Sequence, residues 1–135
     1  MSAMSNYLED ALVAHLNGTQ LPLPANYYVA LFTTATDDAS GGTEVSGGSY
    51  ARVAVSTAPG SWAATAGGNG VTSNASAITF PTSSAALGTV THFAVYDASS
   101  AGNRWLQGAL TSSFNVSAAN ITLSFAANAL QITFA

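Results

Sequence analysis

The feature that most constrains the fold of this chain of 135 residues is a series of short apolar segments separated by turn residues. The segment YYVALFT, at Tyr27–Thr33, is aromatic and β-branched, with apolar residues on both faces, which predicts a central strand. Further segments of strand length are SYARVAVS, GVTSNASAITF, GTVTHFAVYDA, RWLQGALT, NITLSFA and ALQITFA. Seven or eight short strands at this spacing predict a mainly β chain that forms an antiparallel β-sandwich of the jelly-roll kind.

A single helix is expected before the strands begin. An apolar stripe at helical spacing is formed by Leu8, Leu12 and Leu16. Asn6 is expected to cap this helix, with Glu9 completing a capping box, and Gly18 to end it. The chain length suits one domain over 1–135, with a helix over 5–17 and a β-sandwich over 26–135.

Composition excludes several classes of function. Only 6% of the residues are charged and the net charge is −4, so no basic patch can follow phosphates and no nucleic acid is expected as a partner. Without cysteine there is neither a disulfide framework nor a thiolate metal site. No basic region precedes the N-terminal apolar residues and no apolar run approaches a membrane span, so neither a signal peptide nor a membrane partner is expected.

Two arginines are the only fixed cations. Strand alternation places Arg52 on the outer face, where it need not be buried, while the neighbouring valines face the core. Arginine binds carboxylates through two parallel hydrogen bonds. We therefore expect Arg52 and Arg104 to make contacts or to fasten loops, using the carboxylates of Asp37, Asp38, Glu44 and Asp97. The alternative for Arg52 is a solvated residue on the strand face.

No group of residues reaches the level of a catalytic or cofactor site. Asp37, Asp38 and Glu44 are oxygen ligands in one loop, but their spacing matches no EF-hand, and we expect no metal. His15 and His92 are expected to be packed structural residues. The serines do not lie on a strand-to-helix elbow, and GGNG at Gly67–Gly70 lacks the helix and lysine of a phosphate loop. The sequence therefore predicts a protein that is not an enzyme and has no cofactor.

Aromatic residues beside polar or glycine-rich segments are candidates for subunit contacts. Core packing is the expectation for Trp105, and Trp62 is the better interface candidate. The residues expected at an interface are Leu8, Leu12, Leu16, Tyr50, Arg52, Trp62 and Arg104.

Six strings of the sequence, in order, resemble a family of small tailed-phage virion proteins. They are MSNYLEDALVAHL, YVALFTT, GTEVSGGSYARVAV, GGNGVTSNASAITFPT, LGTVTHFAVYDA and QGALT…NVSAANITLSFAANALQITF. Members of this family are labelled phage tail fibre proteins, and some look like capsid decoration or cement proteins. The chain departs from the pattern at Ser61–Gly70 and at Arg104–Trp105.

The resemblance implies a structural protein on the outside of a phage particle, made in the cytoplasm of the bacterial host. A capsid decoration (cement) protein that stabilises the head is the first expectation, and a tail fibre or tail-tip component is the second. The implied partners are the chain itself, as a homotrimer, and the major capsid protein or other virion proteins. An alternative of another class is a carbohydrate-binding β-sandwich that uses Trp62 and Trp105 as platforms.

Overall fold

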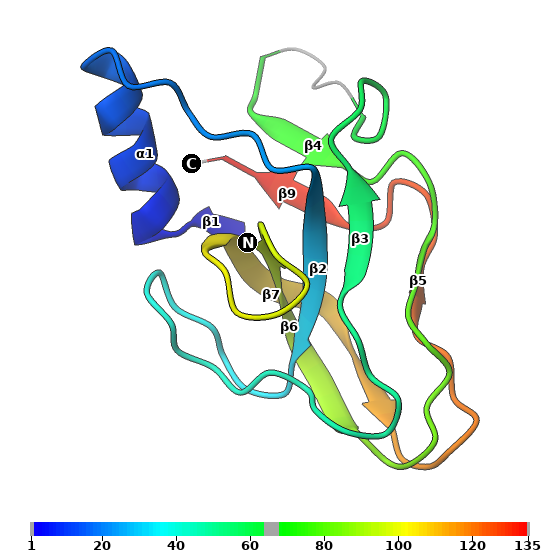
Figure 1. Ribbon diagram of the computed structural model, residues 1–135. Helices are drawn as coiled ribbons and strands as arrows, with labels where there is room; N and C mark the ends of the chain where they lie inside the picture. Colours follow the sequence, from blue (N-terminus) through cyan, green and yellow to red (C-terminus); the bar gives the residue numbers. More distant parts are fainter. Residues whose placement is uncertain (1, 64–67, 135) are drawn as a thin grey trace.

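The computed structural model describes residues 2–63 and 68–134 (Figure 1). Within these ranges the chain forms the helix α1 (Asn6–Leu16) and the strands β1 (Ser2–Met4), β2 (Asn26–Phe32), β3 (Val53–Ser56), β4 (Val71–Ser73), β5 (Ile78–Thr79), β6 (Gly88–Tyr96), β7 (Arg104–Val116), β8 (Ser124–Phe125) and β9 (Gln131–Thr133). A mainly β fold with one N-terminal helix is therefore confirmed. No helix in the described ranges is long and apolar enough to cross a membrane.

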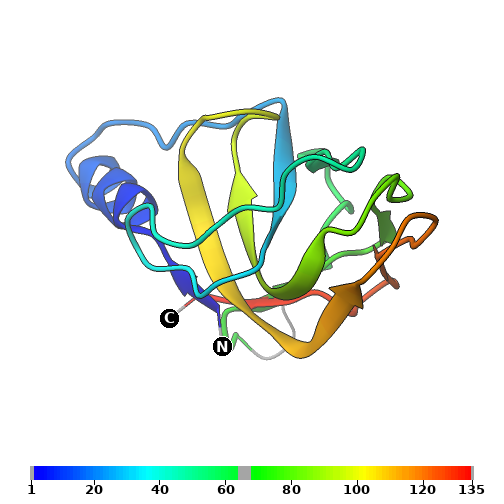
Figure 2. The ribbon, with the colours of Figure 1, turned by 90° about the horizontal axis from the view of Figure 1, so that it is seen from below.

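All strand pairs among the described residues are antiparallel. Five strands form one sheet in the order β1-β7-β6-β2-β3, and β4-β9 and β5-β8 form two short ribbons. In the register of the sheet Val29 lies opposite Val95, and Phe93 lies opposite Gly108. Seen from below in Figure 2, β6 and β7 curve together and α1 lies to one side of the sheet. The ribbons thus act as a second, broken layer of the expected sandwich.

Two of the three inner strands, β2 and β6, are buried on both faces over their last four residues, as a continuous apolar run predicts. The face toward the ribbons carries the main core, which includes Val29, Leu31, Phe93 and Val95 with Ile78 and Ile132 from the ribbons. The opposite face carries a smaller cluster of Ala30, Phe32, Ala94 and Tyr96. The long connection between β2 and β3 packs on this second face, with Gly42 against the Phe32 ring and Arg52 over the Tyr96 ring, and it carries much of the chain's charge.

The N-terminus of α1 is capped by Ser5, so the expectation that Asn6 is the cap was wrong by one residue. The Oγ atom of Ser5 accepts a hydrogen bond from the backbone N–H of Leu8 at 3.3 Å and donates one to the carbonyl of Arg104. Ser5 is only 1% exposed, so its hydroxyl would be buried without a hydrogen-bond partner if it did not make these two bonds. The helix ends at Leu16 with Asn17 as its C-cap, and Gly18 follows with a positive φ of 92°, as expected.

Several strand boundaries differ from those expected. The segment expected as a strand over 49–56 is extended only from Val53, because Gly47–Ser49 has positive φ and forms a turn closed by the Tyr50 N–H. The segment at 70–80 splits into β4 and β5. The strand expected over 104–111 continues to Val116. β1 was not expected, since three residues carry no periodic pattern and pair only through β7.

Candidate functional site

An apolar groove of about 350 Å³ opens beside α1. Its walls come from α1, the segment that follows it, the inner face of the sheet and the β4-β9 ribbon. The lining residues are Leu8, Leu12, Leu21, Tyr27, Trp62, Thr72, Val95, Trp105, Leu106, Ile132 and Phe134. Nearly all are apolar or aromatic, so the apolar groove suits hydrocarbon or aromatic side chains rather than a ligand that needs many hydrogen bonds.

The leucine stripe of α1 begins inside the apolar groove and continues beyond it. Leu8 is 3% exposed and lies on the groove floor, whereas Leu12 is 38% exposed at its rim. Leu16, two turns beyond Leu8, is 86% exposed and does not line the groove. The first turn of the helix is therefore anchored by core packing, while the last turn presents a leucine to solvent.

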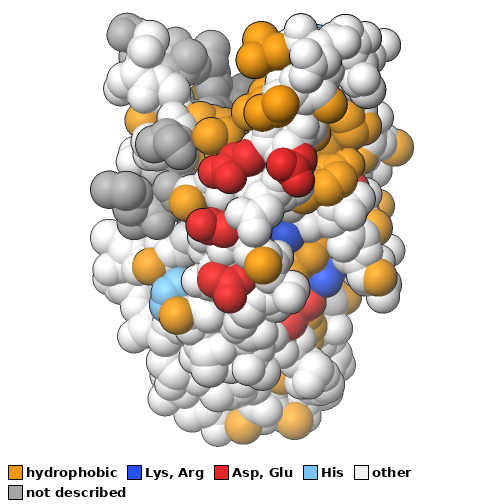
Figure 3. Space-filling view, turned by 90° about the vertical axis from the view of Figure 1, so that its left-hand side faces the viewer, with side chains coloured by type: hydrophobic (Ala, Val, Ile, Leu, Met, Phe, Trp, Pro, Cys, Tyr) orange, Lys and Arg blue, Asp and Glu red, His pale blue; other side chains and the backbone are white. Residues whose placement is uncertain are grey.

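Most exposed large hydrophobic side chains of the described residues lie on or near these elements. On α1, on the segment after it and beside β9 they are Leu12, Val13, Leu16, Leu23 and Phe134, and the remaining one, Phe114, lies on β7. Figure 3 shows hydrophobic side chains gathered at the upper end of one face of the molecule, above a group of acidic ones. Exposed apolar side chains gathered on one face are typical of contact sites between proteins.

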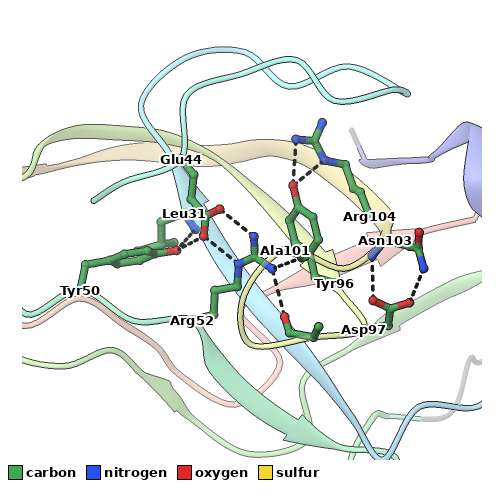
Figure 4. A network of polar contacts seen from close by, with 10 residues as sticks. Leu31, Glu44, Tyr50, Arg52, Tyr96, Asp97, Ala101, Asn103 and Arg104 are labelled. Atoms are coloured by element: carbon green, nitrogen blue, oxygen red, sulfur yellow. Dashed lines mark hydrogen bonds and ion pairs between the residues drawn. The ribbon is translucent and has the colours of Figure 1, made fainter. Parts of the chain in front are cut away.

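Arg52 is the centre of a polar cluster at one end of the sheet (Figure 4). The polar cluster consists of Glu44, Tyr50, Arg52, Tyr96, Asp97, Asn103 and Arg104. Its Nε and Nη2 atoms bind the two carboxylate oxygens of Glu44, each at 2.8 Å. Its Nη1 atom donates to the carbonyls of Ala98 and Ala101 at 3.0 and 2.9 Å. The guanidinium carbon lies 3.7 Å from the centroid of the Tyr96 ring. Arg52 therefore ties the β2–β3 and β6–β7 connections to the sheet.

Burial of Arg52 corrects the expectation that strand alternation leaves it free on an outer face. Its side chain is 7% exposed. The residue does point away from the main core, but Glu44 and the connection at 97–103 cover that face. The expected role in fastening loops is confirmed, because each hydrogen bond of Arg52 leads to a loop residue.

Arg104 extends the polar cluster from the hydroxyl end of the same ring (Figure 4). Its Nε and Nη2 atoms donate to the Tyr96 hydroxyl at 3.1 and 3.0 Å, and its Nη1 atom donates to the Asp37 carbonyl at 2.9 Å. The Asp37 carboxylate lies 3.9 Å from Nη1. Hydrogen bonds from the backbone N–H groups of Gly41 and Ala39, together with the Arg104 charge, hold the pKa of Asp37 below its ordinary value. With its side chain 4% exposed, Arg104 is a second loop fastener.

Tyr50 joins Glu44 to the backbone of β2. Its hydroxyl accepts a hydrogen bond from the Leu31 N–H at 3.0 Å and donates one to Glu44 at 3.0 Å. Its ring stacks on Phe80 at a centroid distance of 6.3 Å. Burial, with the Glu44 charge, raises the pKa of Tyr50 far above its ordinary value, so the phenol remains a neutral donor.

Asp97 organises the turn between β6 and β7. Its carboxylate accepts hydrogen bonds from the Asn103 N–H at 2.7 Å, the Asn103 side chain at 2.9 Å and the Trp105 Nε1 atom at 3.4 Å. Burial alone would raise the pKa of Asp97, but these hydrogen bonds outweigh burial and lower it. At Arg104–Trp105 the chain departs from the family pattern, in which a more uniformly apolar strand start is expected. Both residues have polar partners here, since Arg104 binds the Tyr96 hydroxyl and Trp105 binds Asp97.

The residues expected at an interface separate into two groups. Leu8, Leu12 and Trp62 come together in the apolar groove, and Leu16 projects beyond it. Tyr50, Arg52 and Arg104 lie in the polar cluster, with both guanidinium groups buried. Trp105 is 4% exposed beneath Tyr7 and Tyr27, which confirms its expected core packing and removes it as an exposed sugar platform.

Three apolar residues were missed from the sequence: Leu21 and Phe134, which line the apolar groove, and Leu23, which is exposed. A signal for two of them was present, since Leu21 and Leu23 alternate with prolines in a segment that cannot be helix or inner strand. Apolar residues in such a segment must cover another element or remain exposed.

The described residues contain no group of three histidine or acidic side chains placed to hold a metal ion. Glu44 turns toward Arg52, and Asp37 and Asp38 toward the β7 side of the cluster. His15 is exposed, and its Nδ1 atom accepts from the Leu21 N–H at 3.3 Å, so the expectation of a packed residue was wrong because the last turn of α1 projects from the body. Gly67, part of the glycine-rich string, lies outside the described residues.

Comparison with known proteins matches residues 3–133 to the family described as Podophage GP4 fiber I protein gp80. The chain belongs to this family. The fibre family is one of phage virion structural proteins, so the chain is a component of a bacteriophage particle, as its resemblance implied. No curated protein matches the chain.

Proposed function

We propose that the chain is a non-enzymatic structural subunit of a phage fibre, on the outside of the particle. The observation that carries this proposal is the match to a fibre family over residues 3–133. The architecture supports this proposal. Both arginines are buried in the polar cluster, where they hold loops in place, and the most distinct exposed surface is the apolar groove. A rigid body with one apolar contact surface is what an assembly subunit requires.

Capsid decoration, the first expectation from the sequence, is the second candidate. One observation favours it: the described residues form one compact body, and the sequence has no heptads or repeats of a fibre shaft. The major capsid protein would then be the partner. We rank this candidate second because the family carries a fibre description.

Self-association as a homotrimer remains part of the proposal. Multiple copies of a small domain multiply a modest contact area through symmetry. Light scattering of the purified protein tests it, and a monomer at high concentration would contradict it. A glycan-binding role is weaker, because Thr72 is the one aliphatic hydroxyl in the lining of the apolar groove and Trp105 is buried.

The test of location is immunogold labelling of intact particles with an antibody against this chain. Label on fibres, and its loss from particles whose fibres have been sheared off, is the result expected. Uniform label over the head would refute the fibre proposal and support capsid decoration. Absence of label from intact particles that are shown to contain the chain would refute an exterior position.

A further inference from the structure

We propose that the apolar groove binds a different protein of the particle, through a segment that presents apolar side chains flanked by lysine or arginine. This inference rests on the proposed role as a particle subunit and names the partner of its contact surface. It follows from the apolar lining of the groove and from the sign of every exposed charge around it.

The apolar part of the surface is already formed. Leu8 and Trp62 contribute to a cavity of about 350 Å³, and Leu12 stands at its rim. The helix stripe continues past the groove to Leu16, which the described residues leave 86% exposed. An occupant therefore gains most by inserting apolar side chains between α1 and the β4-β9 ribbon.

An acidic patch adjoins the apolar groove. We define this patch as Glu9, Asp10, Asp37 and Asp38, all of them exposed. Glu9 lies three residues before Leu12 on α1, so the two side chains are neighbours on the helix surface. The loop acids are held near the helix start, because the Asn6 N–H donates to the Asp38 carbonyl at 2.9 Å. Figure 3 shows acidic side chains grouped directly below the hydrophobic ones.

The charges exclude a second copy as the best occupant. The sequence has two basic side chains, Arg52 and Arg104, and they are 7% and 4% exposed inside the polar cluster. A second copy would bring another acidic patch and no exposed lysine or arginine to face the first one. Complementary charge must come from another protein, and like charges at close approach oppose pairing of two such surfaces.

Two synthetic helical peptides test the inference with the full chain. One peptide has leucines along one face and lysines beside them, and the other carries glutamates in place of the lysines. Calorimetry is expected to detect binding of the lysine peptide to the chain and to give at least about tenfold weaker binding for the glutamate peptide. Chemical-shift changes in NMR spectra are expected on α1 and the β4-β9 ribbon. Equal binding of both peptides, no binding of either, or shifts confined to another face would overturn the inference.

Variants test the apolar side chains and the acidic patch separately. Leu12→Ser and Leu16→Ser are each expected to weaken binding of the lysine peptide by about tenfold, the usual effect of losing an apolar anchor. The charge variant Glu9→Gln with Asp10→Asn should weaken it several-fold and reduce its salt dependence. Phe114→Ser, at an exposed phenylalanine on β7, is the matched control and should change nothing. Equal weakening by Phe114→Ser would overturn the inference.

Light scattering on the same variants decides against self-association at this surface. If the wild type is an oligomer and both Leu12→Ser and Leu16→Ser make it a monomer, the surface formed by the groove and the leucine stripe contacts a second copy and the inference is wrong. An unchanged oligomeric state in Leu16→Ser supports it. These results are independent of immunogold label on fibres, so the inference can fail while the proposed fibre role stands.

Discussion

Replacing Arg52 by alanine should be the most destabilising single change in the polar cluster. The substitution removes four hydrogen bonds and the contact with the Tyr96 ring. It leaves the Glu44 carboxylate without its cation in a site where the side chain is 28% exposed. Two loop carbonyls, of Ala98 and Ala101, lose their donor as well.

Breaking one half of a buried ion pair costs about 3–5 kcal/mol. Because water reaches part of Glu44, we expect a loss of free energy of unfolding near the lower end, about 3 kcal/mol. For a domain of this length that corresponds to a fall in Tm of roughly 10 °C. Arg52→Lys preserves the charge but cannot form the forked contact, and should fall about midway between wild type and Arg52→Ala.

Thermal and urea unfolding followed by circular dichroism measure the global effect. Hydrogen exchange locates it, with faster exchange expected at 34–44 and 97–103, the connections that Arg52 joins. A Tm within about 2 °C of wild type for Arg52→Ala, with unchanged exchange in both connections, would refute the reasoning. The arginine would then be an exposed strand residue with an incidental ion pair.

Three further outcomes are expected. Because hydrogen bonding lowers the pKa of Asp97 in the folded state, its contribution to stability is present above the ordinary carboxyl value and is lost as pH falls through the folded one; Tm should therefore drop below about pH 4, and less steeply in Asp97→Asn. Gly102→Ala should destabilise far more than Gly60→Ala in urea unfolding, since both have positive φ but an added Cβ lies 2.5 Å from Asp97 Oδ1 only at Gly102; equal losses would contradict the contact. Leu8→Ala should cost about 2–5 kcal/mol and Leu16→Ala less than about 0.5 kcal/mol, because only Leu8 is buried; similar melting curves for the two would contradict this account of α1.

The sequence pattern predicted those helices and strands whose structure follows from their own residues. The apolar runs of β2 and β6 and the leucine stripe of α1 gave the right element at nearly the right bounds. The polar second half of β7 was missed, because its side chains are mostly exposed and its pairing comes from β6. The Asn6 cap was wrong because Ser5 also binds the distant Arg104 carbonyl, which no local pattern contains.

The candidate site was predictable only in part. Leu12 and Trp62 were expected at an interface, and both line the apolar groove. Burial of Arg52 depends on Glu44 and on the Ala98 and Ala101 carbonyls, which reach it from two different loops. The chain carries few charges, and most of them converge from distant positions on one end of the sheet, an arrangement that strand alternation alone does not predict.

The position of the chain on the particle tests the central claim most directly. Cryo-electron microscopy of intact particles, with the copy number measured from a quantitative gel of the same preparation, gives that position. The account predicts density that fits α1 and the five-stranded sheet within the fibres, with a copy number that matches the number of fibres. Density for the same domain arranged in hundreds of copies over the capsid shell would contradict it.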